Sequence, residues 1–139
     1  MDLNGLKRCN DCFGYAAGDA LICRVADALN DVFPGEACRI GGDEFVILFF
    51  CPGAVVRKRL ADIRQALWHR RQDSELPVEL SFGVAGSDKG GMDAEELLRR
   101  ADAAMLRAKK RRRAASHARI RVWLERHTGR EVADGDPRL

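Results

Sequence analysis

The stretch Arg39-Ile40-Gly41-Gly42-Asp43-Glu44-Phe45 decides how this chain of 139 residues folds. A continuous apolar run, residues 45–50, follows its two glycines and two acids. Paired glycines beside apolar runs predict a β-hairpin, because a tight turn uses positive φ angles that glycine adopts without strain. The sequence therefore predicts two antiparallel strands joined at Gly41 and Gly42.

Asp43 and Glu44 lie at this turn. Neighbouring side chains of an extended chain point to opposite sides, so only one of the two acids faces a given ligand. Glycine leaves bare backbone that a bulky ligand can approach closely. A carboxylate beside such backbone suits Mg²⁺ that carries nucleotide phosphates. On its own, the same tetrapeptide is more typical of a solvated turn.

The composition indicates one globular domain. Hydrophobic residues make up 46% of the chain and charged residues 32%, and the net charge of +3 is too small to point to nucleic acid or a membrane. The odd number of cysteines, five, and the absence of a secretory signal segment favour a cytoplasmic location. No run approaches the roughly 18 apolar residues of a membrane span, so we expect no membrane contact.

Two further patterns carry less weight. Cys9 and Cys12 have the spacing of a metal or redox pair, but no second pair or nearby histidine completes such a site. The basic run of residues 109–113 ends an expected helix, where cations favour the helix dipole. It lacks the aromatic residues that stack on bases, so we expect no nucleic acid partner.

Hydrophobic periodicity predicts an α+β fold, a mostly antiparallel sheet with helices packed on its faces. Asp19 is expected at the start of the first long helix, as an N-cap or first-turn residue. The expected elements are a strand end with a loop or short helix at residues 1–12, a loop at 13–19, a helix at 20–33, the hairpin, a helix at 54–72, a strand at 78–85, a helix from 92 to about 113, and a last strand at 120–124.

Several motifs stand in an order typical of one protein family. They are Asp2-Leu3-Asn4-Gly5-Leu6-Lys7, Asn10-Asp11, Phe13-Gly14, Gly18-Asp19, the stretch from Arg39 to Phe45, Ser81-Phe82-Gly83-Val84-Ala85, Leu97 to Met105, and Ala108-Lys109. Together they resemble the GGDEF family, the diguanylate cyclases of bacterial second-messenger signalling. The resemblance covers residues 2–114.

The resemblance implies a palm-like fold, similar to nucleotidyl cyclases, and an enzyme activity. Members condense two GTP into cyclic di-GMP and release pyrophosphate. Each of two domains holds one GTP, so a homodimer is the implied catalytic form. Such nucleotidyl transfer needs metal-held phosphates, in-line geometry and neutralisation of the developing charge.

The resemblance also assigns roles to residues. Asp2 and Asp43 would bind Mg²⁺ or Mn²⁺, with the Leu3 carbonyl as a further ligand, and Glu44 would be the second catalytic acid beside Asp43. The implied substrate contacts are backbone N–H groups at Gly5 and Leu6 for phosphate, Asn10 and Asp19 for guanine, Gly41 and Gly42 for close approach, and Lys109 and Arg113 for phosphate. Taken without the family, Asn10 and Asp19 are more typical of turn and cap residues.

The chain departs from the family pattern at its start. The N-terminal helix and part of the first strand are missing, so we expect an incomplete first strand in a domain of residues 1–127, followed by a loosely ordered tail at 128–139. No Arg-x-x-Asp motif precedes Gly41, where the sequence reads Val32-Phe33-Pro34-Gly35. The alternative to an active cyclase is therefore a catalytically silent GTP-binding or scaffolding domain, or an inactive fragment.

Overall fold

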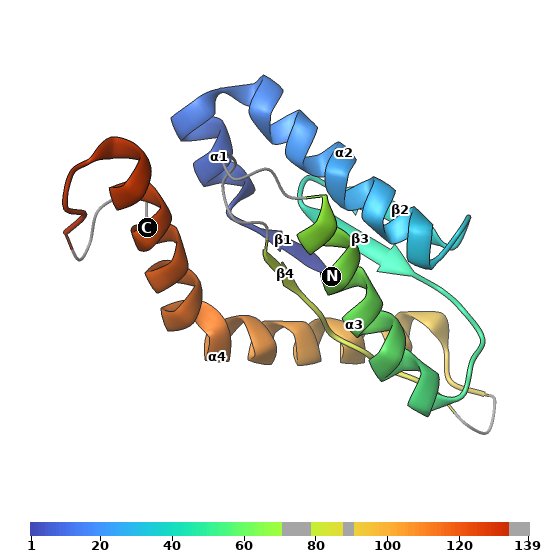
Figure 1. Ribbon diagram of the computed structural model, residues 1–139. Coiled ribbons are helices and arrows are strands. Elements are labelled where there is room, and N and C mark those ends of the chain that lie inside the picture. Colours follow the sequence, from blue (N-terminus) through green and yellow to red (C-terminus); the bar gives the residue numbers. More distant parts are fainter. Residues whose placement is uncertain (71–78, 88–90, 134–139) are drawn as a thin grey trace.

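A computed structural model describes residues 1–70, 79–87 and 91–133 of the chain (Figure 1). Its α+β fold has one open sheet in which every neighbouring pair of strands is antiparallel, as predicted. The strands, in sheet order, are β2 (Ala37–Gly41), β3 (Glu44–Ile47), β1 (Asp2–Asn4) and β4 (Glu79–Ser81). The helices are α1 (Leu6–Phe13), α2 (Tyr15–Val32), α3 (Gly53–His69) and α4 (Ala94–Thr128).

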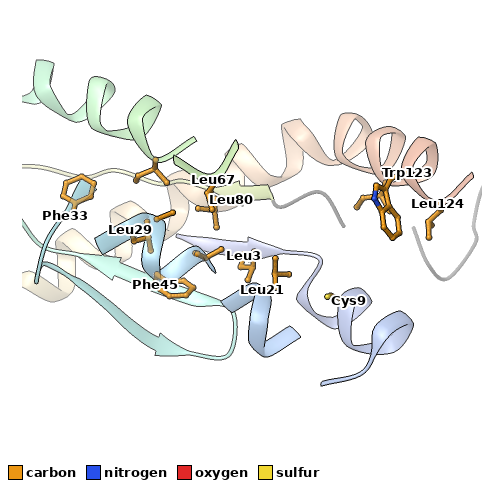
Figure 2. Close-up of a cluster of buried hydrophobic side chains, with 14 of the residues drawn as sticks. Leu3, Cys9, Leu21, Leu29, Phe33, Phe45, Leu67, Leu80, Trp123 and Leu124 are labelled. Atoms are coloured by element: carbon orange, nitrogen blue, oxygen red, sulfur yellow. The ribbon is translucent and has the colours of Figure 1, made fainter. Parts of the chain in front are cut away.

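β1 lies in the middle of the sheet although it has only three residues. Asp2 is opposite Glu44 on one side and Ser81 on the other. Leu3 faces the buried cluster that α2 and α3 form with the sheet, which Figure 2 shows with Leu3 among its labelled side chains. Because successive strand residues face opposite sides, Asp2 points to the other face, where α4 passes.

The hairpin is present, but its glycines act differently from the prediction. Gly41 is opposite Glu44, and Gly42 and Asp43 form the turn. Positive φ angles occur at other described glycines and at neither Gly41 nor Gly42. The Arg39 guanidinium donates two hydrogen bonds, of 3.0 and 2.8 Å, to the Gly42 carbonyl. This arginine, rather than left-handed glycine backbone, stabilises the turn.

The predicted loop at residues 13–19 is wrong. α1 ends at Phe13 and α2 begins at Tyr15, with Gly14 between them at φ 82°. Glycine adopts such a positive φ without strain, so the chain changes direction in one residue and no longer loop is needed. Asp19 consequently lies within α2 and is not its N-cap.

The predicted strand at residues 120–124 is also wrong, because α4 continues through it to Thr128. Ile120, Trp123 and Leu124 are buried at helical spacing, whereas Val122 is 56% exposed. The run of alanine, lysine and arginine before them favours helix over strand. Asp93 is the N-cap of α4, where its side chain accepts from the Glu95 N–H, and Gly129 is the C-cap, with φ 64°.

The remaining boundaries are shorter than predicted or only partly described. β4 covers Glu79–Ser81 of the expected strand 78–85, and α3 ends at His69 rather than residue 72. Residues 71, 72 and 78 lie outside the described part. In the expected tail, Val132 is buried in the core cluster. Within the described ranges, no helix is long and apolar enough to cross a membrane.

α4 joins two parts of the molecule. Figure 1 shows its first half passing beside the sheet and its second half turning towards α1. Gly83, which follows β4, packs against the first part of α4 so closely that an added Cβ would lie 1.8 Å from the Ala101 carbonyl oxygen. At its other end, the Phe13 and Trp123 rings meet edge-on with centroids 5.5 Å apart. One helix therefore relates the position of α1 to that of β4.

Candidate active site

An ion pair lies on the face of β1 that α4 covers. The Lys109 ammonium donates to both carboxylate oxygens of Asp2, each at 2.8 Å. The Asp2 side chain is only 10% exposed and that of Lys109 is 45% exposed. Burying a carboxylate without a partner is costly, so the ammonium stabilises Asp2 in this conformation.

A cavity of about 270 Å³ opens next to this pair, between the end of β1, the start of α1, the hairpin turn and α4. Its lining includes Leu3, Gly5, Leu6, Asp43 and Lys109, all predicted as site residues. Four segments far apart in the sequence thus meet at one place. The other lining residues are Asn4, Lys7, Arg8 and Asp11.

The hairpin turn is attached directly to β1. The Leu3 N–H donates to the Asp43 carbonyl at 2.8 Å, and the turn itself is stabilised by Arg39. This fixes the Asp43 backbone at the cavity while leaving its carboxylate half-exposed. Glu44 is exposed and pairs with Asp2 across the ladder.

The start of α1 presents unpaired donors to the same cavity. Gly5 takes a left-handed conformation at the N-cap, φ 87°, and no described side chain caps the helix. The first N–H groups of a helix lack intrahelical acceptors, and the helix dipole favours an anion there. Gly5 and Leu6 therefore lie where phosphate oxygens could bind.

The two predicted guanine residues lie apart from this cavity. Asn10 packs against Gly18, where an added Cβ would be 1.8 Å from the Asn10 Oδ1. That Oδ1 is buried without a hydrogen-bond partner among the described residues. Asp19, the residue after Gly18, is exposed on α2. The close packing of α1 on α2 brings Asn10 next to the segment that carries Asp19.

The other predicted substrate residues are less enclosed. Gly42 has open space where a Cβ would be, and the nearest atom for Gly41 is a Glu44 carboxylate oxygen at 3.8 Å. Both therefore leave room for a ligand. Arg113 follows Lys109 by one helical turn, is exposed, and does not line the cavity.

Sequence reasoning missed Arg39 and four residues that line the cavity, which are Asn4, Lys7, Arg8 and Asp11. Arg8 follows Gly5 by three residues and Asp11 follows Arg8 by three, so the three positions lie along one face of α1, a signal that the sequence contains. Burial lowers the pKa of the Arg8 guanidinium. Arg39 acts through the turn rather than through the cavity.

The segments that form the cavity lie within the match to a known protein family. The sequence model described as "Diguanylate cyclase, GGDEF domain" matches residues 1–115, most of the chain. The chain belongs to the GGDEF family.

Curated relatives of this GGDEF domain are longer signalling proteins. It is 36% identical over 120 residues to the signaling protein YkoW of Bacillus subtilis, covering 80% of this chain and 15% of that protein. It is 34% identical over 116 residues to the bifunctional diguanylate cyclase/cyclic di-GMP phosphodiesterase MucR of Pseudomonas aeruginosa, covering 78% and 17%. For the biofilm architecture maintenance protein MbaA of Vibrio cholerae, 32% identity extends over 129 residues, covering 78% and 16%. The chain thus spans less than a fifth of the length of these relatives.

The donor set fits a metal that is shared with a substrate. No cluster of three or more His, Cys, Asp or Glu side chains that could hold a metal occurs in the part of the chain described. Mg²⁺ is commonly bound by one or two carboxylates together with substrate phosphates. Asp43 lines the cavity and is a carboxylate of this kind, and Asp2 lies beside the cavity, where it is paired with the Lys109 ammonium.

Proposed function

We propose that this GGDEF domain is a diguanylate cyclase, condensing two GTP into cyclic di-GMP and pyrophosphate. The observation that carries the proposal is the cavity at which the start of α1, the Asp43 turn and Lys109 meet. It combines donors for phosphate with carboxylates for a cation. Membership of a family described as diguanylate cyclases supports the same reaction.

The residues around the cavity would have different roles in binding GTP. N–H groups at Gly5 and Leu6 would bind phosphate oxygens, and Asp2, Asp43 and the Leu3 carbonyl would hold Mg²⁺ or Mn²⁺. The bound metal neutralises phosphate charge and polarises the reacting phosphate. Glu44 would assist the 3′-hydroxyl as an acid–base group. Asn10 and Asp19 would read the guanine edge.

Lys109 would have two positions. In the structure described, its ammonium neutralises Asp2. Because Lys109 also lines the cavity, its ammonium could instead bind the phosphates of a GTP held there, which would leave Asp2 free to hold the divalent cation. Arg113, one turn further along α4, would approach the phosphates from the exposed side.

Condensation requires two GTP molecules held face to face. A cavity that holds a single triphosphate cannot join two of them, so the reaction would take place between two copies of the domain. Each copy would orient the 3′-hydroxyl of its GTP in line with the α-phosphate of the other. The rate per chain should therefore rise with protein concentration.

The test is to incubate the purified chain with GTP and Mg²⁺ and to measure cyclic di-GMP by mass spectrometry. Asp43→Asn and Glu44→Gln should abolish product, whereas Asp27→Asn, at an exposed position of α2, should not. A catalytically silent GTP-binding domain would instead show a GTP-dependent rise in melting temperature without product. Product formation that survives Asp43→Asn would overturn the proposed roles.

A further inference from the structure

Arg8 lies where two cavities meet. It lines the cavity of about 270 Å³ at the start of α1, and it also lines a second cavity, of about 450 Å³, between α1 and the C-terminal end of α4. The smaller volume is below the range of about 300–1,000 Å³ that is usual for small-molecule sites. A ligand as large as GTP must therefore extend beyond the first cavity, and Arg8 lies on a path by which it can do so.

Arg8 is a half-buried cation without an acidic partner. In the described part of the chain, no carboxylate lies within ion-pair distance of its guanidinium, although Asp11 lines the same cavity. Its Nε is buried, whereas its two terminal nitrogens are not among the buried unpaired atoms of the described residues and so reach the accessible surface. Burial lowers the pKa of this guanidinium, because a charge taken out of water without a counter-ion is destabilised. A bound anion would offset that cost.

Helix geometry directs the Arg8 side chain towards the start of α1. Side chains of a helix lean towards its N-terminus, and Arg8 follows Gly5 by three residues, about 4.5 Å along the axis. The N–H groups of Gly5 and Leu6 are those that would bind phosphate oxygens. A guanidinium binds phosphate through two parallel hydrogen bonds, so Arg8 is suited to the next phosphate of the same ligand.

The guanine end of the ligand would lie on another side of α1. Asn10, which would read the base, packs against Gly18 of α2. Residues two apart on a helix are separated by about 200° around its axis, so Arg8 and Asn10 lie on nearly opposite sides. Arg8 is therefore placed for the phosphate end of GTP and not for the base.

Basic residues of α4 lie close to Arg8. Burial lowers the pKa of His117, and the charges of Arg8, Arg113 and Arg121 lower it further, which requires these groups to be near one another. Residues 113, 117 and 121 follow one another at intervals of about one turn and share a face of α4. An anion bound between α1 and α4 would offset the repulsion among these cations.

We propose that Arg8 is a further substrate-binding residue, which holds the β- and γ-phosphates of GTP and then the pyrophosphate that they form on release. The inference rests on the proposed function for the identity of the nucleotide. Arg8 lies between the motifs Asp2–Lys7 and Asn10–Asp11 and belongs to neither. Its charge would also stabilise the negative charge that the leaving pyrophosphate gains.

Inorganic pyrophosphate and GMP are the probes, and their binding is measured by isothermal titration calorimetry with Mg²⁺ present. GMP has the base and one phosphate but lacks the phosphates assigned to Arg8. Arg8→Gln should weaken pyrophosphate binding by about tenfold, the effect of losing one charge-assisted hydrogen bond, and should leave GMP binding unchanged. Arg8→Lys keeps the charge without the paired hydrogen bonds, so it should show an intermediate loss. Arg57→Gln, at an exposed position of α3, should change neither affinity.

Circular dichroism checks that each variant is folded. Three results would overturn the inference: no saturable pyrophosphate binding by the unsubstituted chain, unchanged affinity in the Arg8 variants, or an equal loss for pyrophosphate and GMP. None of these measurements involves cyclic di-GMP. A chain that makes cyclic di-GMP but binds pyrophosphate equally well as Arg8→Gln would refute the role of Arg8 alone. The expected pyrophosphate result in a chain that makes no product would refute the proposed cyclase activity alone.

Discussion

Gly83 sets how closely α4 approaches the sheet, and Gly83→Ala tests this. A Cβ at this position would lie 1.8 Å from the Ala101 carbonyl oxygen and 2.5 Å from the Met105 nitrogen. Both are backbone atoms of α4, so no side-chain rotation can relieve the contact. The helix must move away from the segment that follows β4, and its buried residue Met105 loses packing.

Overpacking of this kind costs about 1–3 kcal/mol. Because the clash is with backbone, we expect the upper end, about 3 kcal/mol, which corresponds to a fall in melting temperature of roughly 10 °C for a chain of this size. The same displacement would carry Lys109 away from Asp2. The Gly83→Ala protein should therefore also bind GTP and Mg²⁺ more weakly.

The assay is thermal unfolding followed by circular dichroism, with Gly86→Ala as the matched control. Gly86 has open space around the added Cβ and no positive φ, so its substitution should change stability by less than about 1 kcal/mol. Equal melting temperatures for the two variants would refute the reasoning, because they would show that α4 can yield without cost.

Three other predictions concern an ion pair, a titration and the turn. Lys109→Gln leaves the Asp2 carboxylate unpaired and should lower the free energy of unfolding by about 1–2 kcal/mol, a figure already reduced because the ammonium is partly exposed. In a urea melt, the double variant Lys109→Gln, Asp2→Asn should regain most of this lost stability. Burial, reinforced by neighbouring arginines, lowers the pKa of His117 below its ordinary 6.5. The unfolded chain therefore binds more protons than the folded one, so the free energy of unfolding should fall as the pH drops below about 6.5. Stability that does not change over this pH range, or that changes equally in His117→Gln, would contradict this. Arg39→Ala removes both hydrogen bonds to the Gly42 carbonyl and should lower cyclase activity while changing the melting temperature little. Arg57→Ala on α3 is the control. A loss of activity that only follows a loss of folded protein would show that Arg39 has a purely structural role.

The sequence predicted the elements that have strong local signals. The helix around Leu21, Val25 and Leu29 and the hairpin at Gly41 and Gly42 are both present. The errors arose where two periods fit the same residues. Alternation of Ile120, Val122 and Leu124 suggested a strand, but the buried set includes Trp123, which only a helix places on the same face.

The site was less accessible to sequence reasoning than the fold. Family resemblance named Asp2 and Lys109, but no local pattern indicates that they form an ion pair. The same holds for Arg39, whose contact with the Gly42 carbonyl depends on the conformation of the turn. The second cavity could not be foreseen at all, since it requires the end of α4 to reach α1, and the sequence predicted a strand there.

The central position of β1 has a consequence for the order of folding. Its first partner, β3, begins at Glu44, its second, β4, begins at Glu79, and the cation that neutralises Asp2 is 107 residues away. A ribosome adding roughly 5–20 residues per second would deliver Lys109 about 5–20 s after Asp2. The hairpin and the α1–α2 pair have local contacts and can form during that interval. β1 can be paired on both sides only after β3 and β4 have been made. Asp2 is therefore made well before the residues that complete its surroundings, and its ion pair with Lys109 is among the last contacts to form.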